Sequence, residues 1–171
     1  MNNYKEYLEN LILPADRERV WLFFLAFSRF EFALKKAGFA NTPANSVRVD
    51  VEWDRFASEH RHAFNPDSGT RLRAACDYFI FHPPKQQILN GSTLGWAESH
   101  QLGTNPLLCW LLTMLRRVRN NLFNGGKFPA PLGPISDPAR DSRLIEHSLV
   151  ILCACLALNP IVQQNFKEPL E

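Results

Sequence analysis

Apolar residues recur at steps of three and four along most of the chain, and hardly any segment alternates at period two for long enough to predict a strand. Turn signals at Asn90-Gly91 and Gly103 make residues 85–104 a loop with helical turns. The pattern predicts helices at about residues 16–37, 50–62, 70–81, 105–123 and 137–158. We therefore expect an all-α fold, a helical bundle of four to five helices, in one domain over residues 1–171.

Local signals support the ends of these helices. The first helix closes with Lys35 and Lys36 before Gly38, which suits the helix dipole and a glycine cap. Asn105 followed by Pro106 is a typical helix start, and it opens the most strongly patterned segment of the chain.

Composition and charge narrow the function classes. Hydrophobic residues make up 46% of the 171 residues, and thirteen phenylalanines and four tryptophans supply material for a core, so the chain should fold. The formal charge of +2 is too small to predict nucleic-acid binding. Basic residues do cluster, however, at residues 71–73 and 116–119.

Cysteine usage and the N-terminal residues favour a cytoplasmic protein. The four cysteines lie in apolar helical patterns without the spacing of a zinc site, so we expect reduced, buried thiols, no metal and no cofactor. Residues 1–19 contain no uninterrupted apolar targeting stretch. The longest apolar run, SLVILCACLALN, is shorter than the roughly 20 residues that a membrane helix needs, so we expect no membrane association.

The helix predicted at residues 105–123 has one apolar and one strongly polar face. The apolar stripe consists of Leu108, Leu111, Leu115, Val118 and Leu122. With Val118 at zero, the polar side chains lie at about 100° to 240° around the helix; they are Arg116, Arg119, Asn120 and Asn124. The helix dipole favours cations near the end of a helix, and a following Gly-Gly terminates it, so structure alone could explain this composition. Yet Asn120 and Asn121 are modest helix formers, which indicates amide groups retained for hydrogen bonding.

The segment RNNLFNGGKF, residues 119–128, resembles the signature of HEPN-domain ribonucleases, in which an arginine, a polar residue, three further positions and a histidine close a long helix. Arg119, Asn120 and Asn124 match these positions in turn, but residue 124 is Asn where the family carries His. The resemblance covers residues 105–128 specifically and the helical bundle only generally. It implies a metal-independent endoribonuclease that pairs two copies of the motif in one dimer cleft.

The resemblance also implies a role for each residue. Arg119 would hold the scissile phosphate and Asn120 would orient it. The family's histidine would act on the 2′-hydroxyl or the leaving oxygen. Asn124 preserves similar hydrogen bonding but has no proton to exchange near neutral pH. Arg116, Arg117 and Lys127 are predicted to bind RNA.

We therefore predict an endoribonuclease of a toxin–antitoxin or antiphage defence system that is silenced by Asn124. The alternative is a non-catalytic HEPN module that binds RNA, nucleotide or a protein partner. Expected partners are RNA, a second copy of the chain and a cognate antitoxin or regulatory protein.

A dimer would also resolve a geometric difficulty. Arg119 and Asn124 are five residues apart, hence about 140° around a regular helix. Either the last turn unwinds at Gly125, or the residues act with those of a second subunit. The aromatic surplus on the first helix is wider than one core stripe requires and suits an interface; it comprises Trp21, Phe23, Phe24, Phe27, Phe30 and Phe32.

Glu31, in the segment FSRFEFALKK, is a further candidate. Some HEPN enzymes use an acid at this place to orient the arginine or the histidine. The competing interpretation is a surface pair with Lys35, four residues along the helix.

The remaining candidates have simpler explanations. His60 and His62 resemble a metal pair but lack further ligands at suitable spacing, so we expect surface residues. His147 is predicted to be half-buried on the last helix. Arg71 and Arg73 could extend an RNA groove, although a solvated helix face is the simpler interpretation.

Overall fold

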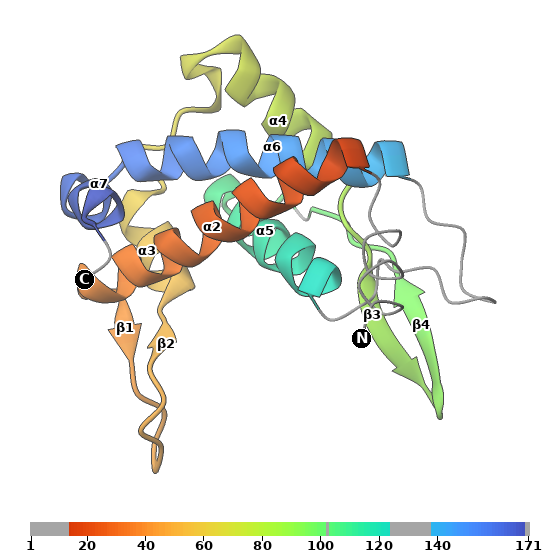
Figure 1. Cartoon of the computed structure of the whole chain (residues 1–171), viewed down its shortest axis with the longest axis horizontal. Coiled ribbons are helices and arrows are strands. Elements are labelled where there is room, and N and C mark those ends of the chain that lie inside the picture. The colour runs from red at the N-terminus through yellow and green to blue at the C-terminus, as the bar shows by residue number, and fades with distance from the viewer. Residues whose placement is uncertain (1–13, 102, 124–137, 170–171) are drawn as a thin grey trace.

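The computed structural model describes residues 14–101, 103–123 and 138–169, and these form a mostly helical fold (Figure 1). It contains six α-helices, named as in Figure 1: α2 (Pro14–Lys36), α3 (Trp53–His60), α4 (Thr70–Phe81), α5 (Leu107–Phe123), α6 (Pro138–Ala157) and α7 (Pro160–Lys167). A short 3-10 turn, Pro66–Ser68, precedes α4. The five predicted helices are confirmed in kind and approximate position within the described residues.

The expectation of an all-α bundle of four to five helices is confirmed in part: the fold is mostly helical, but the described residues form six helices, and two small antiparallel hairpins extend from them (Figure 1). The first pairs β1 (Ala40–Asn41) with β2 (Asp50–Val51), and the second pairs β3 (Gln86–Asn90) with β4 (Thr93–Ala97). The turn signal at Asn90-Gly91 thus closes a hairpin, and Gly91 adopts a φ of 62°, which suits a tight hairpin turn. Two of these strands have two residues each and two have five, and their apolar residues do not alternate with polar ones over enough positions to show a period of two.

The last helix, α7, was also missed. The apolar pattern predicts a last helix that ends at about residue 158, but Asn159-Pro160, directly after it, starts a further helix. The Asn159 side-chain oxygen accepts hydrogen bonds from the backbone N–H groups of Ile161 and Val162, and Pro160 occupies the first turn.

The core lies where α2 crosses the other helices. α2 packs on α6 and α7, α4 packs on α6, and α3 packs on α5 (Figure 1). Aromatic rings fill the contact between α2 and α3, where Phe27 and Phe30 lie 5.6 and 6.0 Å from Trp53 between ring centroids. The predicted stripe on α5 is confirmed: Leu108, Leu111, Leu115 and Val118 are buried, and Leu122 is partly buried.

The cysteines divide into two groups. Cys76 and Cys155 are buried, as predicted, and burial raises the pKa of the Cys76 thiol to about 11. Cys109 is half-buried. Cys153 is exposed, contrary to the expectation, because it falls between the buried positions of α6, which recur at steps of three and four. Within the described residues, no individual helix has the length and apolarity to cross a membrane; α6 and α7 pass that test only as a pair bent by 118°.

Arg29 of α2 fixes the C-terminal end of α7. Its guanidinium donates hydrogen bonds to the backbone carbonyls of Asn165, Phe166 and Glu168, at 3.0, 3.0 and 2.6 Å. These carbonyls lie at a helix end, where a cation is favoured by the unpaired C=O groups and the helix dipole. The contact closes the bundle between α2 and α7.

We expect Arg29→Met to lower the free energy of unfolding by about 2 kcal/mol, because three partly buried carbonyls lose a charged donor. Urea titration followed by circular dichroism measures the change. Arg71→Met is the matched control, since Arg71 is exposed on α4, and it should change stability by less than about 0.5 kcal/mol. Equal stabilities for the two variants would contradict the proposed role of Arg29.

Candidate functional site

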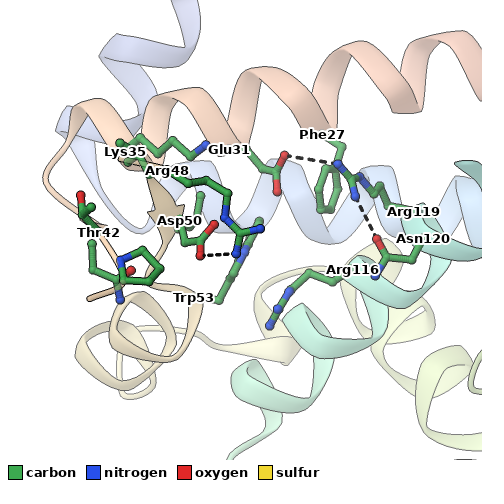
Figure 2. A pocket seen from close by; sticks show the side chains of 14 residues that line it. Phe27, Glu31, Lys35, Thr42, Arg48, Asp50, Trp53, Arg116, Arg119 and Asn120 are labelled. Atoms are coloured by element: carbon green, nitrogen blue, oxygen red, sulfur yellow. Dashed lines mark hydrogen bonds and ion pairs between the residues drawn. The ribbon is translucent and has the colours of Figure 1, made fainter. Parts of the chain in front are cut away.

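A pocket of about 890 Å³ lies between α2, the first hairpin, the start of α3 and the last turns of α5 (Figure 2). For the segment between α2 and α3, residues 40–51, we use the name hairpin arm. The charged and amide side chains of the lining include Glu31, Lys35, Arg48, Asp50, Arg116, Arg119 and Asn120. Four cations therefore face two carboxylates, a formal excess of +2.

Arg119 connects α5 with α2 across this pocket. One guanidinium nitrogen donates a 2.9 Å hydrogen bond to the Asn120 side-chain oxygen, and another lies 4.0 Å from a Glu31 carboxylate oxygen (Figure 2). The guanidinium also lies 5.9 Å from the centre of the Phe27 ring. The structure thus brings together three of the predicted site residues, and Glu31 forms an ion pair with Arg119.

Helix geometry explains this arrangement. Arg116, Arg119 and Asn120 are three and four residues apart, so they share the face of α5 that borders the pocket. Glu31 and Lys35 are likewise one turn apart on α2 and line the same pocket. The buried stripe on the other side of α5 fixes the rotation of the helix and hence the direction of its polar face.

Arg116 and Arg117 lie in different environments although they are neighbours in sequence. The Arg116 guanidinium lies 5.7 Å from the ring centre of Trp53, where the aromatic face favours a cation. Arg117 instead donates to the Ser99 hydroxyl and, at 3.1 Å, to the Gln86 side-chain oxygen. Partial burial lowers the pKa of the Arg117 guanidinium. Arg117 therefore anchors the second hairpin and does not line the pocket.

Asn124 and Lys127 lie outside the described residues. The same holds for Gly125, so both explanations of the 140° offset between Arg119 and Asn124 remain predictions. The described part of α5 ends at Phe123, one residue before the motif's final position.

The hairpin arm supplies site residues that sequence reasoning missed. Arg48 and Asp50 line the pocket and form an ion pair at 2.9 Å. In an extended segment, residues two apart point to the same side, so Arg48-Val49-Asp50 carries a weak signal, although β2 itself begins at Asp50. The sequence pattern predicts no element over residues 42–49, and nothing local indicates that this segment would line a pocket together with α5.

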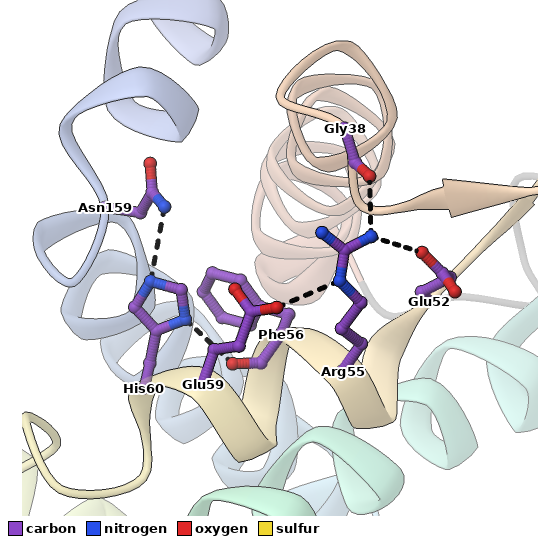
Figure 3. Close-up of polar contacts among 7 residues, drawn as sticks. All are labelled: Gly38, Glu52, Arg55, Phe56, Glu59, His60 and Asn159. Carbon is purple, nitrogen blue, oxygen red and sulfur yellow. Dashed lines mark hydrogen bonds and ion pairs between the residues drawn. The ribbon is translucent and has the colours of Figure 1, made fainter.

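The histidines have structural partners. His60 contacts the Phe56 carbonyl through Nδ1 at 2.8 Å and the Asn159 side-chain nitrogen through Nε2 at 3.2 Å (Figure 3). His62 is exposed, as predicted, and its Nε2 accepts a hydrogen bond from Arg61. Among the residues with described positions, no three His, Cys, Asp or Glu side chains gather as a metal site would require.

Two further predictions concern α6 and α4. His147 is half-buried, as predicted, with its ring 4.6 Å from that of Tyr78, and burial lowers its pKa. Arg73 pairs with Asp67 and Asp77 at the protein surface. α4, which carries both Arg71 and Arg73, contributes no residue to the pocket described above.

Comparison with known proteins yields no matching family model, no matching curated protein and no matching solved structure. These comparisons place the chain in no family, and the resemblance of residues 105–128 to the HEPN signature stays a sequence-based expectation.

Proposed function

We propose that the pocket binds RNA, and that the chain is a HEPN-type metal-independent endoribonuclease of a toxin–antitoxin or antiphage system whose catalytic histidine is replaced by Asn124. The main support is the convergence of Arg119, Asn120 and Glu31 in a pocket with excess positive charge. A planar guanidinium at such a place suits a phosphate, because its N–H groups form a fork that matches two phosphate oxygens.

In this proposal Arg119 holds the phosphate and offsets the negative charge that develops on it during cleavage. Glu31 sets the orientation of the guanidinium through their ion pair. In the histidine-bearing form, the imidazole removes the proton of the 2′-hydroxyl, the 2′-oxygen bonds to phosphorus, and the bond from phosphorus to the 5′-oxygen breaks. A proton returned to the 5′-oxygen leaves a 2′,3′-cyclic phosphate and a 5′-hydroxyl.

Asn124 itself favours a second candidate function. An asparagine has no proton to exchange at neutral pH, so the chain as it stands is suited to binding without cleavage. In that case the protein is a HEPN module that binds RNA, nucleotide or a protein partner.

RNA binding is expected both of the silenced ribonuclease and of a module that binds RNA. We expect Arg119→Ala to weaken binding of a fluorescein-labelled single-stranded RNA by about tenfold at 0.1 M salt, because a charged hydrogen-bond donor to phosphate is lost. Fluorescence anisotropy over a series of salt concentrations measures the affinity. The slope of log K against log salt should become shallower by about 0.7.

Arg71→Ala is the matched control, since Arg71 is an exposed arginine on α4, outside the pocket. It should leave both affinity and slope nearly unchanged. Equal losses in the two variants, or binding that does not respond to salt, would count against RNA binding at the pocket.

The outer face of α2 supports the proposal of a homodimer. Trp21, Leu25 and Phe32 are 60%, 41% and 47% exposed. At 100° per residue they form one stripe on the side of α2 opposite the buried Phe23 and Phe27. Covering such a stripe removes apolar surface from water, which favours association.

We expect the protein to sediment as a dimer at micromolar concentration and Leu25→Glu to sediment as a monomer, because a charge would be buried in an apolar contact. Leu89→Glu is the matched control, since Leu89 is 66% exposed on the second hairpin. A Leu25→Glu variant that remains a dimer would show that the α2 stripe is not the interface. If the unmodified chain sediments as a monomer, the proposal of a homodimer is wrong.

A further inference from the structure

The hairpin arm carries a cation into the pocket from the side away from α5. Figure 2 shows the Arg48 guanidinium between the arm and α2, in the direction of Arg116. Lys35, in the last turn of α2, lines the same part of the pocket. The Arg48 side chain is 75% exposed, so its ion pair with Asp50 leaves most of the guanidinium accessible to a ligand.

Hydrogen bonds hold the arm in shape although it is short. Strand pairing at its base joins Ala40 to Val51 and Asn41 to Asp50. Farther out, the Ser46 N–H donates to the Pro43 carbonyl at 3.1 Å, and the Ser46 hydroxyl accepts from the Arg48 N–H at 3.0 Å. Arg48 therefore projects from a folded turn.

The base of the arm is also tied to both helices that flank it. Arg55 of α3 donates to the Gly38 carbonyl at 3.1 Å and to a Glu52 carboxylate oxygen at 2.8 Å (Figure 3). The Glu52 N–H donates to the Phe39 carbonyl at 3.1 Å. These bonds join the end of α2 to the start of α3, so the position of the arm is coupled to two helices that contribute residues to the pocket lining.

The geometry points to a second phosphate position, formed by Arg48 and Lys35, on the other side of the pocket from the position formed by Arg116 and Arg119. The ligand is then a stretch of single-stranded RNA with at least two phosphates, rather than one nucleoside monophosphate. This inference rests on the proposed function and specifies the substrate class of the same pocket.

Size and charge both support two positions. A volume of about 890 Å³ is near the upper end of the roughly 300–1,000 Å³ typical of pockets for whole small molecules, so a single phosphate group would occupy little of it. The cations come from separate elements, and each of the ion-paired arginines, Arg48 and Arg119, has its own carboxylate. Single strands follow basic grooves of this kind, whereas duplex RNA is recognised across a broad shallow surface.

The test compares a 12-nucleotide fluorescein-labelled oligouridylate with UMP as an unlabelled competitor, at 0.1 M salt. We expect Arg48→Gln and Lys35→Gln each to weaken oligonucleotide binding about fivefold and to reduce the salt slope by about 0.7, since each removes one phosphate contact. Competition by UMP should change less than twofold in these variants but about tenfold in Arg119→Ala. Arg71→Gln is the control with the same chemical change at an exposed site outside the pocket.

Unchanged oligonucleotide affinity in both Arg48→Gln and Lys35→Gln would overturn the second position. So would equal losses for UMP and oligonucleotide, or tighter binding of a duplex than of the single strand. If Arg119→Ala still weakens binding in that case, the proposed function stands and only this inference fails. If Arg119→Ala has no effect either, both fail. Thermal unfolding of each variant verifies that the substitutions leave the fold intact.

Discussion

Asn124→His is expected to give a protein that cleaves single-stranded RNA in the presence of EDTA, whereas the unmodified chain leaves the RNA intact. The substitution supplies a group that titrates near neutral pH at the one motif position where the chain lacks it. Proton transfer by a positioned side chain contributes about 10²- to 10⁴-fold to rate. Arg119 and Asn120 already lie in the pocket, so the proposed phosphate position needs no further substitution.

Gel analysis of 5′-labelled RNA over an hour measures this cleavage, and the products should carry 2′,3′-cyclic phosphates. Asn124→Gln is the control, because it changes the same position without adding a titratable group. The double variant Asn124→His with Arg119→Ala should lose most of the gained activity. A folded, dimeric Asn124→His protein without cleavage of transfer, messenger or ribosomal RNA would exclude the silenced ribonuclease and favour the binding module.

Most helices were predictable because their signals are local. The stripe of Leu111, Leu115 and Val118 repeats at helical spacing, and caps such as Lys35-Lys36 before Gly38 mark the ends. The hairpins were not predictable in the same way. β1 and β2 have two residues each and are paired across the eight-residue segment 42–49, so a period of two has no room to appear.

Within the candidate site, too, the residues that local spacing predicts differ from those that depend on how the elements pack. Arg116, Arg119 and Asn120 share a face of α5, which follows from their spacing alone. The ion pair of Glu31 with Arg119 depends on how α2 and α5 pack, and only the resemblance to HEPN enzymes suggested it. The contribution of Arg48 depends on the direction of the hairpin arm. Arg117 is predicted to bind RNA together with its neighbour Arg116, but its guanidinium instead bonds to Gln86 and Ser99, and the sequence gives no sign of these contacts.

Substitution of Glu31 is the test that best distinguishes an effect on RNA binding from an effect on RNA cleavage. Its carboxylate lies 4.0 Å from the Arg119 guanidinium and is 28% exposed. Under the proposed function, we expect this carboxylate both to orient the arginine and to repel an incoming phosphate. Removing the charge changes the formal sum in the pocket from +2 to +3. Loss of the carboxylate should therefore strengthen RNA binding but lower the rate of cleavage.

We therefore expect Glu31→Gln, introduced into the Asn124→His protein, to bind RNA several-fold more tightly while kcat falls about 100-fold, since misplacing a group by about 1 Å can cost that much. Single-turnover cleavage measures the rate, and anisotropy with a 2′-deoxy substrate analogue measures the affinity. Lys35→Gln is the contrasting variant, because it should weaken binding and change kcat less. If Glu31→Gln lowers affinity and leaves kcat unchanged, Glu31 does not position Arg119, and the ion pair belongs to the structure of the pocket alone.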